Sequence, residues 1–256
     1  MLQSASTMTE SAAIVIGAGS SIGSALCKRW QQDDAISHVF AVSREHAAVP
    51  EQNEDTSIKH IACDYTEASI IDACETIKTL LDEMQLETIS RVCICNGILH
   101  NDNVWPEKRI EELTSDSLIE VFSINSVTPL LWLKALITLV KAPSDCVITV
   151  FNARIGSIGD NRSGGWYSYR ASKAALNMLL KTAAIEYARR AKNVKLISFH
   201  PGTTDTALSK PFQGSVKKEN LFTPDFVAQH LVQIMNRQNV DGELSFIDWE
   251  NKSIVW

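Results

Sequence analysis

Short apolar segments alternate with longer amphipathic segments along the whole chain, and this alternation limits the possible folds more than any other feature. Strands that alternate with helices favour a parallel sheet with helices on both faces. We therefore predict an α/β protein with one doubly wound domain and a seven-stranded, mostly parallel sheet. The expected strands are residues 12–16, 38–42, 58–62, 91–95, 146–151, 195–199 and 244–248. The expected long helices are residues 22–31, 66–84, 115–141 and 166–191.

The length of 256 residues suits one large domain, and no change in composition divides the chain. We expect a disordered tail over residues 1–11 and a single domain over residues 12–256. The net charge of −6 argues against a dedicated nucleic-acid surface, and the longest apolar stretch is too short to span a bilayer. Six cysteines in mostly apolar segments, without a secretory signal, indicate reduced side chains, a cytoplasmic location and no metal site.

A glycine-rich turn follows the first expected strand and opens a helix. Such a turn leaves backbone N–H groups free at a helix N-terminus, where a pyrophosphate can bind, as in Rossmann-type domains. A purely structural turn is one alternative. A second is the nucleophile elbow of a hydrolase with Ser21 as nucleophile, although too few residues precede it to supply an oxyanion loop. The turn reads Gly17, Ala18, Gly19, Ser20, Ser21, Ile22 and Gly23.

The second expected strand ends in Ser43 and Arg44, where a dinucleotide-binding domain selects its cofactor. NAD-binding domains place an acidic residue there to hold the ribose 2′-hydroxyl, and this chain has none. Arginine can grip a 2′-phosphate with its planar guanidinium, and serine can add a hydroxyl. The pair therefore favours NADP(H) over NAD(H), with an ordinary surface charge at Arg44 as the alternative.

Tyr169 and Lys173 lie four residues apart in the last long helix, so both side chains share one helix face. A neighbouring ammonium favours the phenolate, so we expect the Tyr169 pKa to fall below its usual value near 10. A tyrosine tuned in this way can donate a proton to a carbonyl oxygen or remove one from an alcohol.

Five motifs together resemble the short-chain dehydrogenase/reductase family in their order and spacing, over nearly the whole chain. The segment from Trp166 to Asn177 resembles the sniffer/C-factor-like carbonyl reductase branch in particular. The motifs are the glycine turn, Asn96-Gly97, Asn125, Tyr169 with Lys173, and Pro201-Gly202.

The resemblance implies a role for each matching residue. Tyr169 would be the acid/base, Lys173 would hold the nicotinamide ribose, and Asn125 would anchor a water that relays protons to Lys173. The remaining residues would contact the cofactor. They are Gly17, Ser20, Ser21, Ile22 and Gly23 at the pyrophosphate, Asp64 and Tyr65 at the adenine, Asn96 and Gly97 at the adenosine ribose, and Pro201, Gly202 and Thr206 at the nicotinamide.

The chain departs from the family pattern at two positions. Ser21 replaces the usual middle glycine of the phosphate turn. Asn152-Ala153 stands where the family often has a serine pair after the fifth strand. Ser157 lies 12 residues before Tyr169, close to the usual interval between the two catalytic groups, and we predict that its hydroxyl orients the substrate oxygen.

The sequence thus predicts an NADP(H)-dependent oxidoreductase that transfers hydride between nicotinamide and a carbonyl or alcohol. The alternative is a regulatory protein that binds NADP(H) on the same fold without turnover. We expect a small-molecule substrate, no membrane or nucleic-acid partner, and a homodimer or homotetramer.

Overall fold

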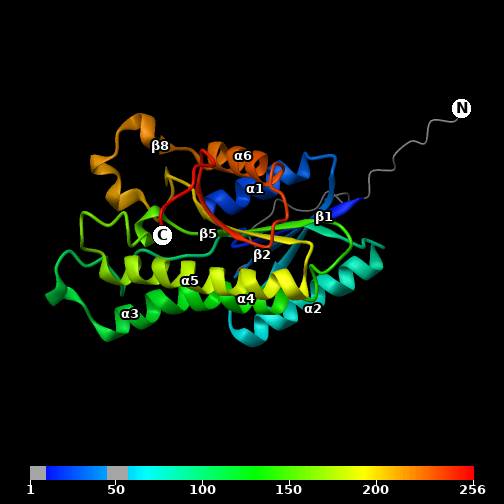
Figure 1. Ribbon diagram of the computed structural model, residues 1–256, viewed down its shortest axis with the longest axis horizontal. Helices are drawn as coiled ribbons and strands as arrows, with labels where there is room; N and C mark the ends of the chain where they lie inside the picture. Colours follow the sequence, from blue (N-terminus) through cyan, green and yellow to red (C-terminus); the bar gives the residue numbers. More distant parts are fainter. Residues whose placement is uncertain (1–9, 45–56) are drawn as a thin grey trace, which may run out of the picture.

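A computed structural model describes residues 10–44 and 57–256 and contains one large parallel sheet (Figure 1). Its seven strands are all parallel and follow the order β3-β2-β1-β4-β5-β6-β9. The predicted seven-stranded, doubly wound fold is confirmed. The strands are β1 (Ser11–Ile16), β2 (Ile36–Ser43), β3 (Ile58–Ala62), β4 (Ile89–Ile94), β5 (Cys146–Phe151), β6 (Val194–His200) and β9 (Leu244–Asp248).

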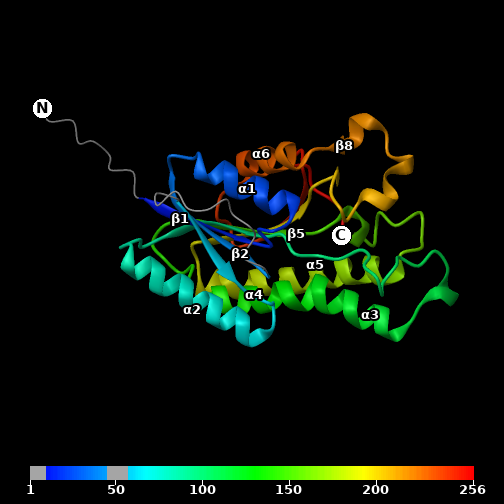
Figure 2. The same ribbon diagram turned by 180° about the vertical axis from the view of Figure 1, so that it is seen from behind.

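Helices cover both faces of the sheet (Figures 1 and 2). The helices α1 (Ser21–Gln31) and α6 (Pro224–Met235) lie on one face. The other face carries α2 (Glu67–Glu83), α4 (Thr128–Leu136) and α5 (Tyr167–Arg190), with α3 (Ser115–Phe122) leading into α4. Alternate residues of β1 enter the two cores, with Ile14 in one and Val15 in the other. Burial on both faces explains why the strands are continuous apolar runs.

One predicted helix differs from the structure. The stretch expected as a single helix over residues 115–141 is α3, a π-helical turn at Ser123–Val127, and then α4, which ends at Leu136. The extra residue of a π turn aims a side chain inward, and here that side chain is the fully buried Asn125. Tertiary hydrogen bonds of Asn125 hold this irregularity, so helical periodicity did not reveal it.

The segment after β6 is more structured than its polar sequence indicates. It contains a short parallel pair, β7 (Thr203–Thr204) with β8 (Leu221–Phe222), and it leads into α6, which was not predicted. Of the predicted tail over residues 1–11, residues 1–9 lie outside the described part, and Ser11 already belongs to β1. Every helix in the described part of the chain is too short or too polar to cross a membrane.

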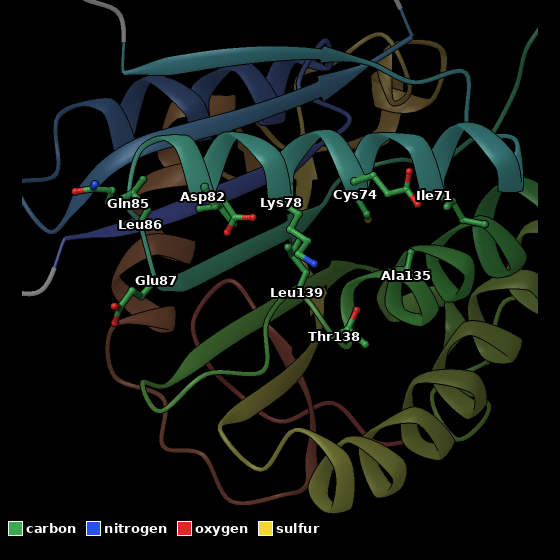
Figure 3. Close-up of a pocket in the computed structure, with 12 residues that line it drawn as sticks. Ile71, Cys74, Lys78, Asp82, Gln85, Leu86, Glu87, Ala135, Thr138 and Leu139 are labelled. Atoms are coloured by element: carbon green, nitrogen blue, oxygen red, sulfur yellow. The ribbon is translucent and has the colours of Figure 1, made fainter.

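A groove of about 700 Å³ lies between α2 and α4 (Figure 3). Lys78 and Asp82 of α2 line it opposite Thr138 and Leu139, and none of the predicted site residues belongs to it. The groove therefore takes no part in the candidate site, which lies at the carboxyl edge of the sheet.

Candidate active site

Four groups of predicted site residues follow four neighbouring strands. Gly17 comes after β1, Asn96 after β4, Ser157 after β5, and Gly202 after β6. Because these strands are parallel, their carboxyl ends meet at one edge of the sheet, which is where open α/β sheets bind ligands.

The glycine turn is closely packed and needs its glycines. Gly17 has φ +84°, and a Cβ there would lie 3.2 Å from the backbone nitrogen of Asn96. A Cβ at Gly23 would lie only 2.3 Å from the Gly17 carbonyl oxygen. Ser20 caps α1 by accepting a hydrogen bond from the Gly23 amide at 3.0 Å, while Ser20 and Ser21 remain exposed. This exposed helix N-terminus fits an anionic phosphate.

The adenosine end of the site is built from β2 and the start of α2. A Cβ built on Gly19 would lie 3.7 Å from the Ser43 Cβ, so the end of β2 lies beside the glycine turn. The exposed Arg44 directly follows Ser43. The Asp64 carboxylate is exposed, and its Oδ1 accepts hydrogen bonds from the amide and the hydroxyl of Thr66. These bonds lower the Asp64 pKa and secure the entry into α2.

Tyr65 has a left-handed backbone, φ +69°, and its ring packs edge-on against Trp132 at 6.4 Å between centroids. Burial raises the Tyr65 pKa to about 12, while Arg44 and the Gly17 amide act in the opposite direction. Tyr65 therefore lies between the core and the phosphate turn, and only part of its ring can face an adenine.

Asn96 and Asn125 connect the phosphate turn to α5. Asn96 Nδ2 donates to the Ile124 carbonyl at 3.0 Å, and its buried Oδ1 has no partner among the described residues. Such an orphaned acceptor fits a ribose hydroxyl donor. Asn125 accepts from the Ile98 amide at 2.7 Å and donates to the Ile98 carbonyl at 2.9 Å and to Ser172 Oγ at 3.1 Å.

Tyr169 and Lys173 face each other, as the four-residue spacing predicts. Lys173 Nζ lies 5.9 Å from the Tyr169 ring centroid and donates to the Phe151 carbonyl at 3.1 Å. The expected fall in the Tyr169 pKa is wrong for the protein without cofactor. Burial raises the Tyr169 pKa to about 12 and lowers the Lys173 pKa to about 8. The ammonium is turned toward the Phe151 carbonyl, and desolvation dominates at the phenol.

Ser157 is buried after β5, and its Oγ accepts a hydrogen bond from the Asp160 amide at 3.1 Å. This bond uses an oxygen lone pair and leaves the hydroxyl hydrogen for another acceptor. A Cβ at the preceding Gly156 would lie 2.7 Å from the Lys173 carbonyl carbon. The Ser157 loop is therefore packed directly against the helix that carries Lys173.

The last predicted group follows β6. Gly202 has φ +73°, and a Cβ there would lie 2.5 Å from the Phe222 ring, so the turn requires glycine. Pro201 precedes it, and Thr206 Oγ1 donates to the Thr204 carbonyl at 3.4 Å. These contacts position the turn at the edge of the sheet beside the end of β6.

Sequence reasoning missed several groups around Tyr169. The buried Glu107 binds Ser168, and aromatic rings from three separate segments form a cluster that reaches Tyr169. Glu107 stands in a charged stretch, Glu-Lys-Arg, whose composition indicates a solvated loop. The ring contacts join His100 and Trp105, Trp105 and Phe212, Phe212 and Trp166, and Trp166 and Tyr169, with centroids 5.0–6.2 Å apart.

Comparison with known proteins identifies the family. Residues 11–216 match the family model described as short chain dehydrogenase. The chain belongs to this family of oxidoreductases that act on small molecules. It is 25% identical over 248 residues to a benzil reductase ((S)-benzoin forming) of Bacillus subtilis. This alignment covers 90% of this chain and 96% of the relative.

Solved structures share the fold at lower sequence identity. The carbonyl reductase Sniffer of D. melanogaster superposes with a TM-score of 0.82 at 20% identity, covering 96% of this chain and 100% of that chain. The NADPH-bound carbonyl reductase from chicken fatty liver superposes with a TM-score of 0.77 at 21% identity, covering 96% of this chain and 98% of that chain. The predicted resemblance to sniffer-like carbonyl reductases is confirmed in the fold.

Proposed function

We propose that the protein reduces a carbonyl compound with NADPH and can run the reverse oxidation of the alcohol. The observation that carries this proposal is a series of linked contacts between the glycine turn and the Tyr–Lys pair. Gly17 packs against Asn96, Asn96 binds Ile124 next to Asn125, and Asn125 binds Ser172 next to Lys173, whose Nζ lies near the Tyr169 ring. A protein that only binds the cofactor has no need of a tyrosine beside a buried lysine at the edge of the sheet.

Tyr169 is the proton donor in this mechanism. A pKa of about 12 keeps the phenol protonated at neutral pH, ready for a carbonyl oxygen that becomes basic as hydride arrives. The nicotinamide cofactor supplies that hydride when bound. Ser157 donates its hydroxyl hydrogen to the same oxygen and orients it. Lys173, whose pKa of about 8 leaves it mostly charged at pH 7, stabilises the phenolate after proton transfer.

Arg44 is proposed to select NADP(H). It is exposed and directly follows Ser43, which lies beside the glycine turn, and its charge lowers the Tyr65 pKa against the effect of burial. A guanidinium at this place can pair with a 2′-phosphate on the adenosine ribose. The NADPH-bound carbonyl reductase of the same fold supports this cofactor.

The aromatic cluster indicates a carbonyl compound that carries an aromatic group. Trp105 is 55% exposed and is in contact with Phe212, which in turn contacts Trp166 beside Tyr169. Rings of this kind bind a flat apolar substituent edge-to-face or in an offset stack. The benzil reductase among the relatives, named for an aromatic diketone, supports the same substrate class.

We also propose a homodimer or homotetramer formed through α5. Met178 and Ile185 are 69% and 50% exposed and lie seven residues apart, so they form an apolar stripe on this helix. Light scattering of the wild type and of a Met178→Glu, Ile185→Glu variant tests this, and a monomeric wild type would contradict it.

The function is tested by mixing the purified protein with NADPH and a panel of carbonyl compounds that includes benzil. We expect oxidation of NADPH that depends on the carbonyl, and loss of turnover in Tyr169→Phe with NADPH binding retained. Tight NADPH binding without turnover of any carbonyl would favour the regulatory alternative.

A further inference from the structure

The catalytic helix α5 begins in an unusual way. Gly164, Gly165 and Trp166 have φ values of +62°, +66° and +54°, a run of left-handed residues that ends in a bulky side chain. Trp166 is the N-cap residue, and its side chain makes no capping hydrogen bond. A helix start usually has an extended N-cap residue whose own side chain accepts from the first turn. The first turn of α5 therefore depends on groups from outside the helix.

Glu107 supplies the missing acceptors from the loop between β4 and α3. Its Oε2 accepts from the Ser168 amide at 3.1 Å, and its Oε1 accepts from the Ser168 hydroxyl. Its backbone carbonyl accepts from the Trp166 amide. The side chain is only 3% exposed, although it lies 61 residues from Ser168 in the sequence. A carboxylate at this place also complements the positive end of the helix.

The second turn of α5 has separate anchors. Asn125 Nδ2 donates to Ser172 Oγ at 3.1 Å, and Ser126 Oγ donates to the Ser172 carbonyl at 2.7 Å. Lys173 directly follows Ser172, and its Nζ donates to the Phe151 carbonyl at 3.1 Å. Tyr169 directly follows the residue that Glu107 holds, and its carbonyl also accepts from Ser172 Oγ at 2.8 Å. Glu107 is therefore an anchor of the Tyr169 turn that Lys173 does not share, while the anchors at Ser172 serve both residues.

We propose that Glu107 is a positioning residue that helps to set the place of Tyr169 through Ser168, while Lys173 keeps its own anchors at Ser172 and Phe151 when Glu107 is lost. This inference rests on the proposed function, since it assigns Tyr169 the proton transfer. A displacement of about 1 Å at a reacting group can reduce turnover up to a hundredfold. Losing Glu107 therefore lowers kcat and leaves NADPH binding, which uses the glycine turn and Lys173, nearly unchanged.

The test compares Glu107→Ala, Glu107→Gln and Ser168→Ala with Glu111→Ala, an exposed carboxylate of the same loop. For benzil reduction with NADPH we expect kcat to fall about tenfold or more in Glu107→Ala, with the NADPH Kd within about twofold of the wild type. Glutamine can accept from the Ser168 amide and donate to its hydroxyl, so Glu107→Gln restores most of kcat. Ser168→Ala keeps one of the two bonds and gives an intermediate kcat. Glu111→Ala behaves as the wild type.

Amide hydrogen exchange gives a second readout that does not require turnover. In Glu107→Ala, or in Ser168→Ala if the former does not fold, residues 165–171 exchange faster while residues 176–187 are unchanged. Wild-type kcat and exchange in Glu107→Ala would overturn the inference, and so would an equal loss of kcat and NADPH affinity in every folded variant. If the wild type reduces no carbonyl, the proposed function fails, and with it the role assigned to Glu107, whatever the exchange experiment shows.

Discussion

Replacing Lys173 with methionine should make the protein more stable while it removes activity. Lys173 is 4% exposed, and its burial lowers its pKa from 10.5 to about 8. A shift of this size corresponds to about 3–4 kcal/mol of unfavourable charging in the folded state. Loss of the charged hydrogen bond to the Phe151 carbonyl offsets about 1.5–3 kcal/mol of that gain. The net expectation at pH 7 is about 0.5–2 kcal/mol of added stability, or roughly 1–8 °C in Tm.

The pH dependence separates this effect from a general change in packing. Below pH 8 both the folded and the unfolded wild type carry the Lys173 proton, so the full penalty is present. Between pH 8 and 10.5 the folded protein loses that proton first, and this group makes the wild type more stable as the pH rises. The advantage of Lys173→Met should therefore shrink across this interval, as measured by urea unfolding at several pH values.

Lys195 offers a matched control, because it is also buried but has a carboxylate partner. Its Nζ donates to both oxygens of Asp241 at 2.7 and 2.8 Å. Lys195→Met should destabilise the protein by about 1–3 kcal/mol, since it removes an ion pair in which the lysine is buried and the aspartate is half exposed. If Lys173→Met were also destabilising at pH 7, with an unchanged pH dependence, the reasoning about its desolvation would be refuted.

Four further predictions concern the cofactor, the chemistry and acid stability. Arg44→Ala should weaken NADPH binding by about 10- to 100-fold and leave NADH binding nearly unchanged by calorimetry, and equal wild-type affinities for the two cofactors would contradict it. Tyr169→Phe should lower kcat at least about 100-fold with NADPH affinity intact, and near-normal turnover would remove Tyr169 from the mechanism. Ser157→Ala should lower kcat with the NADPH Kd unchanged, whereas the exposed-loop control Ser163→Ala should be active; the reverse result would show that Ser157 is the wrong serine. Burial lowers the His200 pKa to about 4. As the pH falls below 6.5, the unfolded chain therefore takes up this proton before the folded protein does, and the free energy of unfolding drops by about 2 kcal/mol by pH 5. His200→Asn should lose less stability than the wild type over this pH range, as measured by urea unfolding, and equal losses in the two proteins would contradict the assignment.

The sequence alone was sufficient for features that depend on neighbouring residues. The alternation of strands and helices predicted the parallel sheet, because strands that are buried on both faces consist of continuous apolar residues. The glycine turn was visible because only glycine adopts φ +84° at Gly17 without strain and leaves room at Gly23 for the Gly17 carbonyl. Tyr169 and Lys173 were paired from their spacing, since one helical turn brings them to the same face.

Tertiary structure decided the features that depend on groups far apart in the chain. The π turn at Asn125 exists because its side chain binds Ile98 and Ser172, which lie 27 and 47 residues away. The capping of α5 by Glu107 spans 61 residues, and no local pattern distinguishes this glutamate from its solvated neighbours. The direction of the Tyr169 pKa shift was reversed for the same reason. Sequence spacing reveals a nearby lysine, but only the packed structure determines how much water the phenol loses and where the ammonium points.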